Sequence, residues 1–144
     1  MSARYIPDTA KALEVILWLA SSRPGIDVYH VVKCAYYADK RHLNAYGRPI
    51  AGDWYEADQY GPKGQCVYGL MRGRPIEVLA LENNGRIPLT VTEHYIVIPE
   101  REPNVSRLSD SDRDALSWAL TEYADLSFDE LLELSHREEA YLKA

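Results

Sequence analysis

The sequence is poor in cysteine and has no long apolar run. Its 144 residues include only two cysteines, Cys34 and Cys66, which are too few for the disulfide framework of a small secreted protein. No apolar stretch is long enough to span a bilayer. The apolar part of the N-terminal segment, residues 13–20, is interrupted by Glu14 and does not follow the basic region of a signal peptide. These absences predict a cytoplasmic protein with reduced thiols.

Basic residues are scarce at the C-terminal end of the chain. The whole chain carries 16 Lys and Arg against 22 Asp and Glu, a net charge of −6. Residues 1–100 hold 11 of each sign, whereas residues 101–144 hold 5 basic and 11 acidic residues. The excess charge argues against non-specific binding of a phosphate backbone by the last third. It suits either a basic protein partner or simply a solvated acidic helix face.

Capping signals predict helices along most of the chain. Asp8 and Asp27 precede segments with helical apolar periodicity, which we expect to form helices over residues 9–22 and 28–46. Gly47, followed by Pro49, ends the second helix. A turn at Gly61-Pro62 is predicted to lead into a short helix from about residue 63 or 64 to 71.

The last third of the chain carries two further helix starts. Ser109 with Asp112, and Ser127 with Glu130, have the spacing of capping boxes. Leu126 and Leu131 have the spacing of a hydrophobic staple around the second of these starts.

Between the third helix and these two, the sequence favours β structure. Residues 76–82, 86–90 and 95–99 are candidate strands, and Asn83-Asn84-Gly85 is a strong hairpin signal. We therefore predict one α+β domain over residues 1–144, mostly α-helical and compact, with a small antiparallel β-hairpin or sheet at about residues 76–99.

Six of the eleven tyrosines fall within residues 31–70. Tyrosine combines a large ring with one polar tip, so it suits both core boundaries and interfaces. Helical periodicity assigns Tyr36 and Tyr46 to the core. Tyr37, Tyr55 and Tyr60 are the better candidates for an exposed interface.

Residues that could support metal binding or catalysis are scattered. His30 and Cys34 have the i, i+4 spacing of two ligands on one helix, but no second pair completes a metal site, so we expect no bound metal. Cys34 lies on an apolar face, where a free cysteine is usually a small buried hydrophobe. Neither cysteine is in a sequence typical of a nucleophile turn, and there is no phosphate-binding loop. Basic residues near residues 40–74 are balanced by acidic ones, so we do not expect direct DNA binding.

The central stretch, KCAYYADKRHLNAYGRPIAGDWYEADQYGPKGQCVYGLM, resembles the SocA-like antitoxin family, also called the Panacea domain. The resemblance rests on a K-L-x-Y-Y-A-D…H-L…Y-G-R-P-I helix end and on a following Y-G-P…V-Y segment. The matching residues are Lys33, Tyr36, Tyr37, Ala38, Asp39, His42, Leu43, Tyr46, Gly47, Arg48, Pro49, Ile50, Tyr60, Gly61, Pro62, Val67 and Tyr68.

A second family pattern, Y-x-D-L-S…E-L…L-S-H-x-E, resembles the C-terminal segment. Its residues here are Tyr123, Asp125, Leu126, Ser127, Glu130, Leu131, Leu134, Ser135, His136 and Glu138. Two departures stand out: Cys34 occupies a position where the family usually has Leu, and Tyr141 lies near a usual Trp. The resemblance assigns a structural role to Tyr36, Asp39, Gly47, Pro49, Gly61, Pro62, Tyr68, Ser127 and His136.

The resemblance implies an antitoxin, of a bacterial or phage-associated system, that neutralises a partner toxin by direct binding and without catalysis or cofactor. The toxin would be encoded by an adjacent gene. Some relatives carry an added DNA-binding domain, for which we expect no room here. We expect the toxin-binding residues to be Tyr37, Trp54, Tyr55 and Tyr60.

Two alternatives stay open at this point. The chain could act as a proteolytic adaptor that delivers the toxin to a cellular protease, or it could be a small hydrolase or metal enzyme. The sequence also leaves the oligomeric state open, a homo-oligomer included.

Overall fold

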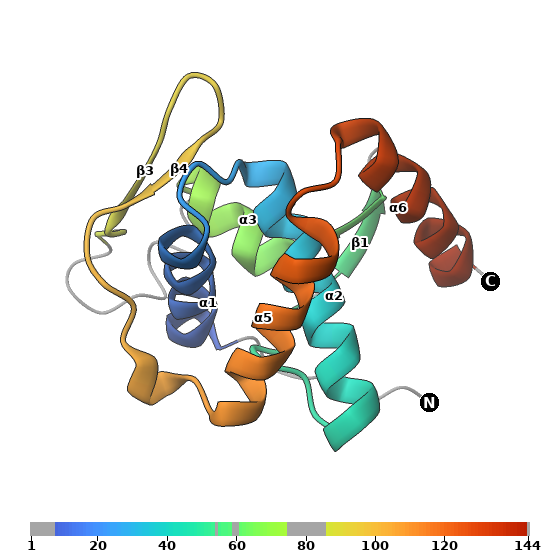
Figure 1. Cartoon of the computed structure of the whole chain (residues 1–144), viewed down its shortest axis with the longest axis horizontal. Coiled ribbons are helices and arrows are strands. Elements are labelled where there is room, and N and C mark those ends of the chain that lie inside the picture. The colour runs from blue at the N-terminus through green and yellow to red at the C-terminus, as the bar shows by residue number, and fades with distance from the viewer. Residues whose placement is uncertain (1–7, 54, 59–60, 75–85, 144) are drawn as a thin grey trace.

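The computed structural model describes residues 8–53, 55–58, 61–74 and 86–143 (Figure 1). It confirms a mostly helical α+β fold with small antiparallel β elements. The elements, in chain order, are α1 (Thr9–Ser22), α2 (Val28–Tyr46), β1 (Tyr55–Asp58), β2 (Gly61–Gly64), α3 (Gln65–Arg72), β3 (Leu89–Val91), β4 (Val97–Pro99), the 3₁₀ helix η1 (Val105–Arg107), α5 (Asp110–Tyr123) and α6 (Phe128–Lys143).

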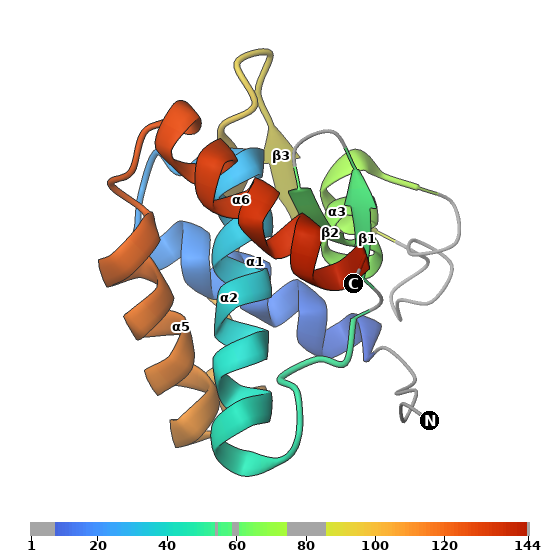
Figure 2. The same cartoon turned by 90° about the vertical axis from the view of Figure 1, so that its right-hand side faces the viewer.

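Helix α2 is the centre of the fold. α5 packs along it with opposite chain direction, and α1 passes behind it at a steep angle (Figure 2). Every α2 residue from Val31 to Asp39 is buried, so this part of the helix has no solvent-facing side. A helix covered on all sides shows no simple apolar stripe in its sequence.

Burial of α2 stops at His42, and this corrects one prediction. Tyr46, expected in the core, is 61% exposed, and Leu43, on the same expected inner face, is also exposed. The last turn of α2, residues 43–46, therefore lies outside the core. Tyr36 and Cys34, by contrast, are buried as predicted.

The predicted capping residues are confirmed at both N-terminal helices. The Asp8 carboxylate accepts a hydrogen bond from the Lys11 amide at 3.0 Å, and Asp27 accepts one from the His30 amide at 2.8 Å. Gly47 ends α2 at a φ of 76°, a left-handed conformation that glycine adopts without strain.

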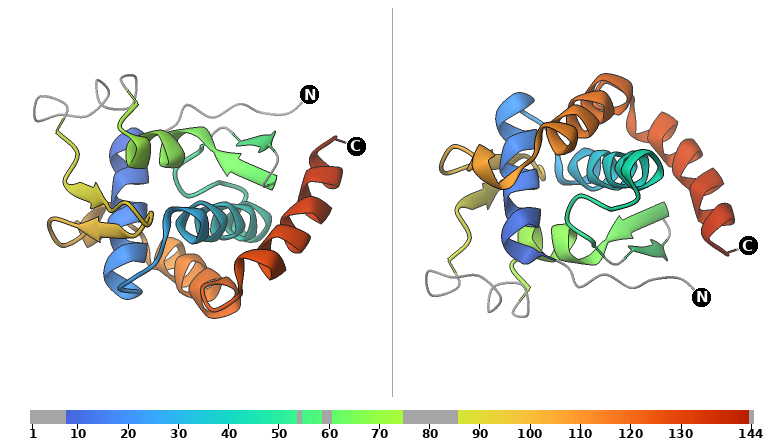
Figure 3. Two further views of the ribbon diagram at one scale, coloured as in Figure 1. Left: turned by 90° about the horizontal axis from the view of Figure 1, so that it is seen from above. Right: turned by 90° about the horizontal axis from the view of Figure 1, so that it is seen from below.

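Both predicted capping boxes are also present. Ser109 Oγ accepts from the Asp112 amide at 3.0 Å while Asp112 accepts from the Ser109 amide at 2.9 Å. Ser127 and Glu130 exchange the equivalent bonds at 3.1 and 3.0 Å. α6 then leaves the α2–α5 pair and runs to the β1–β2 hairpin, where it contacts both strands (Figure 3).

The turn predicted at Gly61-Pro62 is wrong, because both residues belong to strand β2. Asp58 pairs with Gly61, and Ala57 pairs with Pro62, in an antiparallel hairpin. Helix α3 consequently begins at Gln65.

The start of α3 is fixed by a residue distant in sequence. The Asp53 carboxylate accepts hydrogen bonds from the amides of Cys66 and Val67 at 2.7 and 2.9 Å. A Cβ at Gly64 would lie 2.4 Å from Asp53 Oδ2, so only glycine leaves room for this cap.

The small antiparallel sheet predicted at about residues 76–99 is confirmed by one pair of strands. β3 pairs with β4, with Thr90 opposite Ile98. The candidate strand at 76–82 and the Asn83-Asn84-Gly85 hairpin lie outside the described residues. The turn of the β3–β4 hairpin is attached to the start of α2, because the Val28 amide donates to the Tyr95 carbonyl at 2.8 Å.

Candidate partner-binding site

Tyr37, predicted to be exposed, is a buried packing residue. Only 6% of its surface is accessible. Its ring stacks on Tyr123 of α5, with centroids 4.2 Å apart and an interplanar angle of 16°, and meets Tyr36 edge-on. The prediction was wrong because α2 is covered on two opposite sides, whereas the periodicity argument assumed one covered side.

Tyr55 is half-buried, and its side chain contacts residues of α2. Its hydroxyl donates to Asp39 Oδ2 at 2.9 Å, and its ring meets Tyr36 edge-on at 4.9 Å. Burial raises the pKa of Tyr55 well above its usual range, and the nearby carboxylates of Asp39 and Asp53 add to the shift. Trp54 and Tyr60, the other two predicted toxin-binding residues, lie outside the described residues.

Asp39 links the start of β1 and the loop after α2 to the centre of the fold. Its Oδ1 accepts from the Ile50 amide at 2.5 Å, while Oδ2 accepts from Tyr55. Burial raises the pKa of Asp39, and these hydrogen bonds offset only part of that effect. Asp39 therefore acts as a positioning residue for the segment that follows Gly47 and Pro49.

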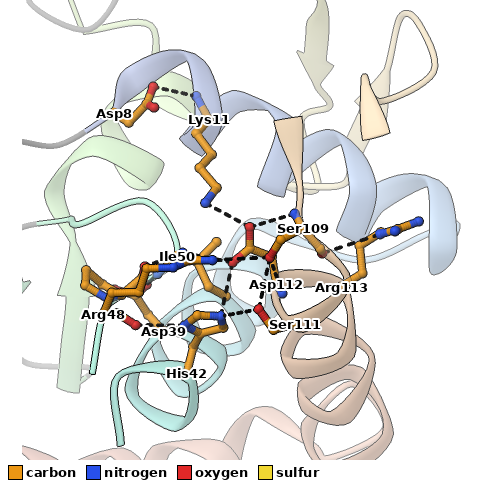
Figure 4. A network of polar contacts seen from close by, with 11 residues as sticks. Asp8, Lys11, Asp39, His42, Arg48, Ile50, Ser109, Ser111, Asp112 and Arg113 are labelled. Atoms are coloured by element: carbon orange, nitrogen blue, oxygen red, sulfur yellow. Dashed lines mark hydrogen bonds and ion pairs between the residues drawn. The ribbon is translucent and has the colours of Figure 1, made fainter. Parts of the chain in front are cut away.

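A second polar group, which we call the Asp112 cluster, joins α1, α2 and α5 (Figure 4). It consists of Lys11, His42, Arg48, Ser109, Ser111 and Asp112. Lys11 Nζ lies 2.8 Å from Asp112 Oδ2, and Arg48 Nη1 lies 3.3 Å from Oδ1. The His42 ring lies between the Arg48 carbonyl, 2.7 Å from Nδ1, and Ser111 Oγ, 2.8 Å from Nε2.

The single carboxylate of the Asp112 cluster is paired with both cations of the cluster. His42 and Asp112 are both completely buried. Burial alone would raise the pKa of Asp112, but the ion pair with Lys11 and the hydrogen bonds with Ser109 outweigh it and lower the pKa. Such a buried carboxylate, paired with cations from α1 and from the loop after α2, holds these elements together.

A hollow lies elsewhere, where the start of α2, β2, the end of α3, the β3–β4 turn and the start of α6 meet. It is an open groove of about 850 Å³. We call it the cation–tyrosine groove. Its lining residues are Asp27, Val28, Tyr29, Val32, Lys33, Lys63, Tyr68, Arg72, His94, Tyr95 and Phe128.

Each of the three cations that line this groove lies near a tyrosine ring of the same groove. Lys33 Nζ is 5.3 Å from the Tyr29 centroid and Lys63 Nζ is 4.3 Å from that of Tyr68. The Arg72 guanidinium is 5.9 Å from the Tyr95 centroid. These contacts hold the cations against the aromatic walls of the groove.

The floor of the groove contains an unexpected buried lysine. Lys33 is 1% exposed, and its ammonium donates to the Pro62 carbonyl at 2.6 Å. One local signal could have indicated this placement, since Lys33 interrupts an otherwise apolar helix segment. Tyr68, expected to be structural, also contributes to the groove wall.

His30 and Cys34, the pair considered for metal binding, both contact other residues of the fold. His30 Nδ1 lies 2.8 Å from Asp27 Oδ1 and Nε2 lies 2.7 Å from the Leu126 carbonyl. Burial raises the pKa of Cys34 to about 12, which keeps the thiol protonated at neutral pH. His136 is exposed on α6. Among the described residues, no three His, Cys, Asp or Glu side chains are grouped so that they could hold a metal ion.

A small helical domain with an open aromatic and cationic groove is typical of a binding module. The family model described as Antitoxin SocA-like, Panacea domain, matches residues 31–141, from the first turns of α2 into α6. The chain belongs to this antitoxin-like family. No curated protein and no solved structure matches it significantly. No helix in the described ranges is long and apolar enough to cross a membrane.

Proposed function

We propose that this chain is the antitoxin of a bacterial or prophage toxin–antitoxin pair and neutralises its cognate toxin by direct, non-catalytic binding in the cytoplasm. The observation that carries the proposal is the family match over residues 31–141. The groove supports it by offering aromatic area and concentrated charge, the features that dominate binding energy at protein interfaces.

The acidic side chains of the C-terminal helices favour a toxin with a basic surface, because opposite charges attract each other before contact. Seven carboxylates of α5, α6 and the loop between them are exposed: Asp110, Asp114, Glu122, Asp125, Asp129, Glu130 and Glu133. A surface of one sign raises the association rate with a partner of opposite sign, and the effect weakens as salt is added.

Co-expression with the product of the adjacent gene tests the proposal. We expect the neighbouring protein to arrest growth alone, and this chain to restore growth and co-purify with it in a fixed stoichiometry. Growth arrest that persists despite full expression of this chain, together with no complex, would overturn the proposal.

The same cultures separate neutralisation by binding from proteolytic adaptation. Direct binding predicts that the toxin concentration stays constant while growth recovers. An adaptor predicts a toxin concentration that falls only when both this chain and a cellular protease are present.

A further inference from the structure

His30 joins two parts of the fold that are far apart in the sequence. Its side chain comes from the first turn of α2 and is 12% exposed. Nδ1 lies 2.8 Å from Asp27 Oδ1, and Nε2 lies 2.7 Å from the Leu126 carbonyl oxygen. Leu126 immediately precedes Ser127, the residue that caps α6. One imidazole ring therefore connects the start of α2 to the start of α6.

Both partners of this ring are hydrogen-bond acceptors. Burial alone would raise the pKa of Asp27, but hydrogen bonds from the side chain and amide of His30 outweigh it and lower the pKa, so Asp27 is ionised at neutral pH. An ionised carboxylate and a backbone carbonyl can only accept. The two contacts therefore need an N–H donor on each ring nitrogen, and only the protonated imidazolium form of His30 has both.

Loss of one proton would break one of the two contacts. The remaining proton is expected on Nδ1, because a hydrogen bond to an ionised carboxylate is stronger than one to a carbonyl. Nε2 would then turn a lone pair toward the Leu126 carbonyl oxygen, at a distance where two acceptors repel each other. The contact on the α6 side is therefore the one that opens.

The start of α6 carries part of the wall of the cation–tyrosine groove. Phe128, the first residue of α6, is 45% exposed, and its ring centroid lies 4.6 Å from that of Tyr29 on α2. Both residues line the groove. Since Phe128 follows Leu126 by two positions, movement of the Leu126 carbonyl away from His30 would shift Phe128 as well.

Tyr95, which lines the groove from the β3–β4 turn, is held without a titratable group. Its φ is 64°, a left-handed conformation that is rare for tyrosine, and no other non-glycine residue in the described ranges has a positive φ. Its amide donates to the Thr92 carbonyl at 2.9 Å, and its carbonyl accepts from the Val28 amide at 2.8 Å. A change in the protonation of His30 would therefore alter the wall at Phe128 and leave Tyr95 in place.

We propose that Asp27, His30 and Leu126 form a proton-dependent link, which we call the His30 link. With both ring nitrogens protonated, the link holds the start of α6 against α2 and keeps Phe128 in the groove wall; loss of one proton releases this wall and weakens binding of the toxin. The effect on the toxin rests on the proposed function, whereas the movement of α6 is a property of the free chain.

The surroundings of His30 determine the pH at which the link opens. The hydrogen bond to Asp27 is the largest cause that raises the pKa of His30; burial opposes it, and the Leu126 carbonyl adds to it. Because the pKa is raised, the link should be closed at and below about pH 6.5 and should open as the pH rises through the folded-state pKa.

Charged and titratable groups reach this region from several elements. Arg23, at the end of α1, lowers the pKa of His30, and Arg23 is itself paired with Asp125 in the loop before α6. The Tyr29 ring meets the His30 ring edge-on at 6.1 Å. Other charged or titratable side chains on the β3–β4 turn and at the start of α6 are exposed to solvent, which screens them: Glu93, His94, Asp129 and Glu130.

Nuclear magnetic resonance of the free full-length chain tests the link itself. The ring signals of His30 and the amide signals of residues 126–128 are expected to shift with pH at one common midpoint above about 6.5. Amide signals of residues 109–112 are the control and should not share this midpoint. If His30 titrates and residues 126–128 do not respond, the link is wrong.

Asp27→Asn separates a proton-dependent link from a merely structural contact. Asparagine also caps helices, so α2 should still form, and circular dichroism checks this. Without the carboxylate charge, the common midpoint of His30 and residues 126–128 is expected to move to lower pH. An unchanged midpoint would contradict the role of the charge.

Calorimetry with the purified product of the adjacent gene tests the effect on binding. Between about pH 6 and 8 the affinity of the wild-type chain is expected to fall roughly two- to five-fold more than that of His30→Gln. Groups of the partner that titrate affect both proteins alike. Near the midpoint, binding should also take up more protons with wild type than with His30→Gln, because linkage is reciprocal. His94→Gln, in the groove lining, is the matched control and should keep the decline.

The outcomes separate the two proposals. Parallel affinity profiles for wild type and His30→Gln would overturn control of binding by the link while the antitoxin function stands. A decline that disappears in His94→Gln would assign the effect to His94 and overturn the proposal as well. If the wild-type chain does not bind the neighbouring protein, the proposed function fails together with the effect on binding, and the resonance experiment alone decides the link.

Discussion

The Asp112 cluster and the cation–tyrosine groove differ in what their charged side chains contact. In the cluster, Lys11 and Arg48 surround one completely buried carboxylate, so charge of both signs meets inside the fold. In the groove, Lys63 and Arg72 lie near the rings of Tyr68 and Tyr95, in a hollow that is open to solvent. The cluster therefore connects helices, whereas the groove offers aromatic surface that a partner can contact. Substitutions in the first should change stability, and substitutions in the second should change binding.

The largest loss of stability is expected for Asp112→Ala. The substitution leaves Lys11 and the completely buried His42 without their carboxylate and removes the hydrogen bond that Asp112 accepts from the Ser109 amide, so it should lower the free energy of unfolding by about 3–5 kcal/mol. Urea unfolding measures the change, and Asp112→Asn provides a milder variant. Asp110→Ala, in the same helical turn but exposed, is the control and should change stability by under about 0.5 kcal/mol. Equal effects of the two alanine variants would contradict the structural role of the cluster.

A smaller loss is expected for Gly64→Ala. The new methyl group would lie 2.4 Å from the Asp53 carboxylate that caps α3, so the cap has to move, at a cost of about 1–3 kcal/mol. Asp53→Asn tests the same cap from the other side. If the cap is the cause, the double variant should lose less than the two single variants together.

A pH-dependent effect of about 1 kcal/mol or less is expected at His30. The hydrogen bond to Asp27 is the main cause that raises the pKa of His30, and the Leu126 carbonyl adds to it. Because the pKa of His30 is higher in the folded state, its stabilising contribution to the free energy of unfolding is fully present below the unfolded-state pKa of about 6.5. This contribution is lost as the pH rises through the folded-state pKa. Thermal unfolding of wild type and His30→Gln between about pH 5.5 and 8 measures it. Parallel pH profiles for the two proteins would show that the pair adds nothing.

The smallest effect on stability is expected for Tyr95→Asn, in the groove. Asparagine adopts positive φ more readily than tyrosine, so stability should stay within about 0.5 kcal/mol of wild type or rise slightly. Binding to the partner should nevertheless weaken. A loss of more than about 1 kcal/mol in urea unfolding would assign Tyr95 to the scaffold and remove the contrast between the two regions.

Local signals in the sequence predicted the helices well, because capping is encoded within a few residues. Asp8, Asp27, Ser109 and Ser127 all cap the helices expected of them. The β1–β2 hairpin and the start of α3 were not predictable in this way. The cap of α3 comes from Asp53, which precedes the β1–β2 hairpin and lies thirteen positions before Cys66 in the chain.

The candidate site was predicted less well, because exposure depends on how many elements cover a helix. Periodicity placed Tyr37 outside and Tyr46 inside, and the structure reverses both assignments. The groove draws its residues from five separate elements, and its key tyrosine is exposed by a hairpin turn attached to α2. No local sequence pattern indicates that residues from these separate elements meet in one groove. The family motif located Lys33 and Tyr68 but not their shared groove.

Hydrogen–deuterium exchange on the complex tests the central contrast most directly. The full-length chain would be compared with and without the purified product of the adjacent gene. The account predicts slower exchange at residues 63–72 and 92–95, which border the groove, and unchanged exchange at residues 109–112 of the Asp112 cluster. Slower exchange at the cluster, with no change along the groove, would contradict it.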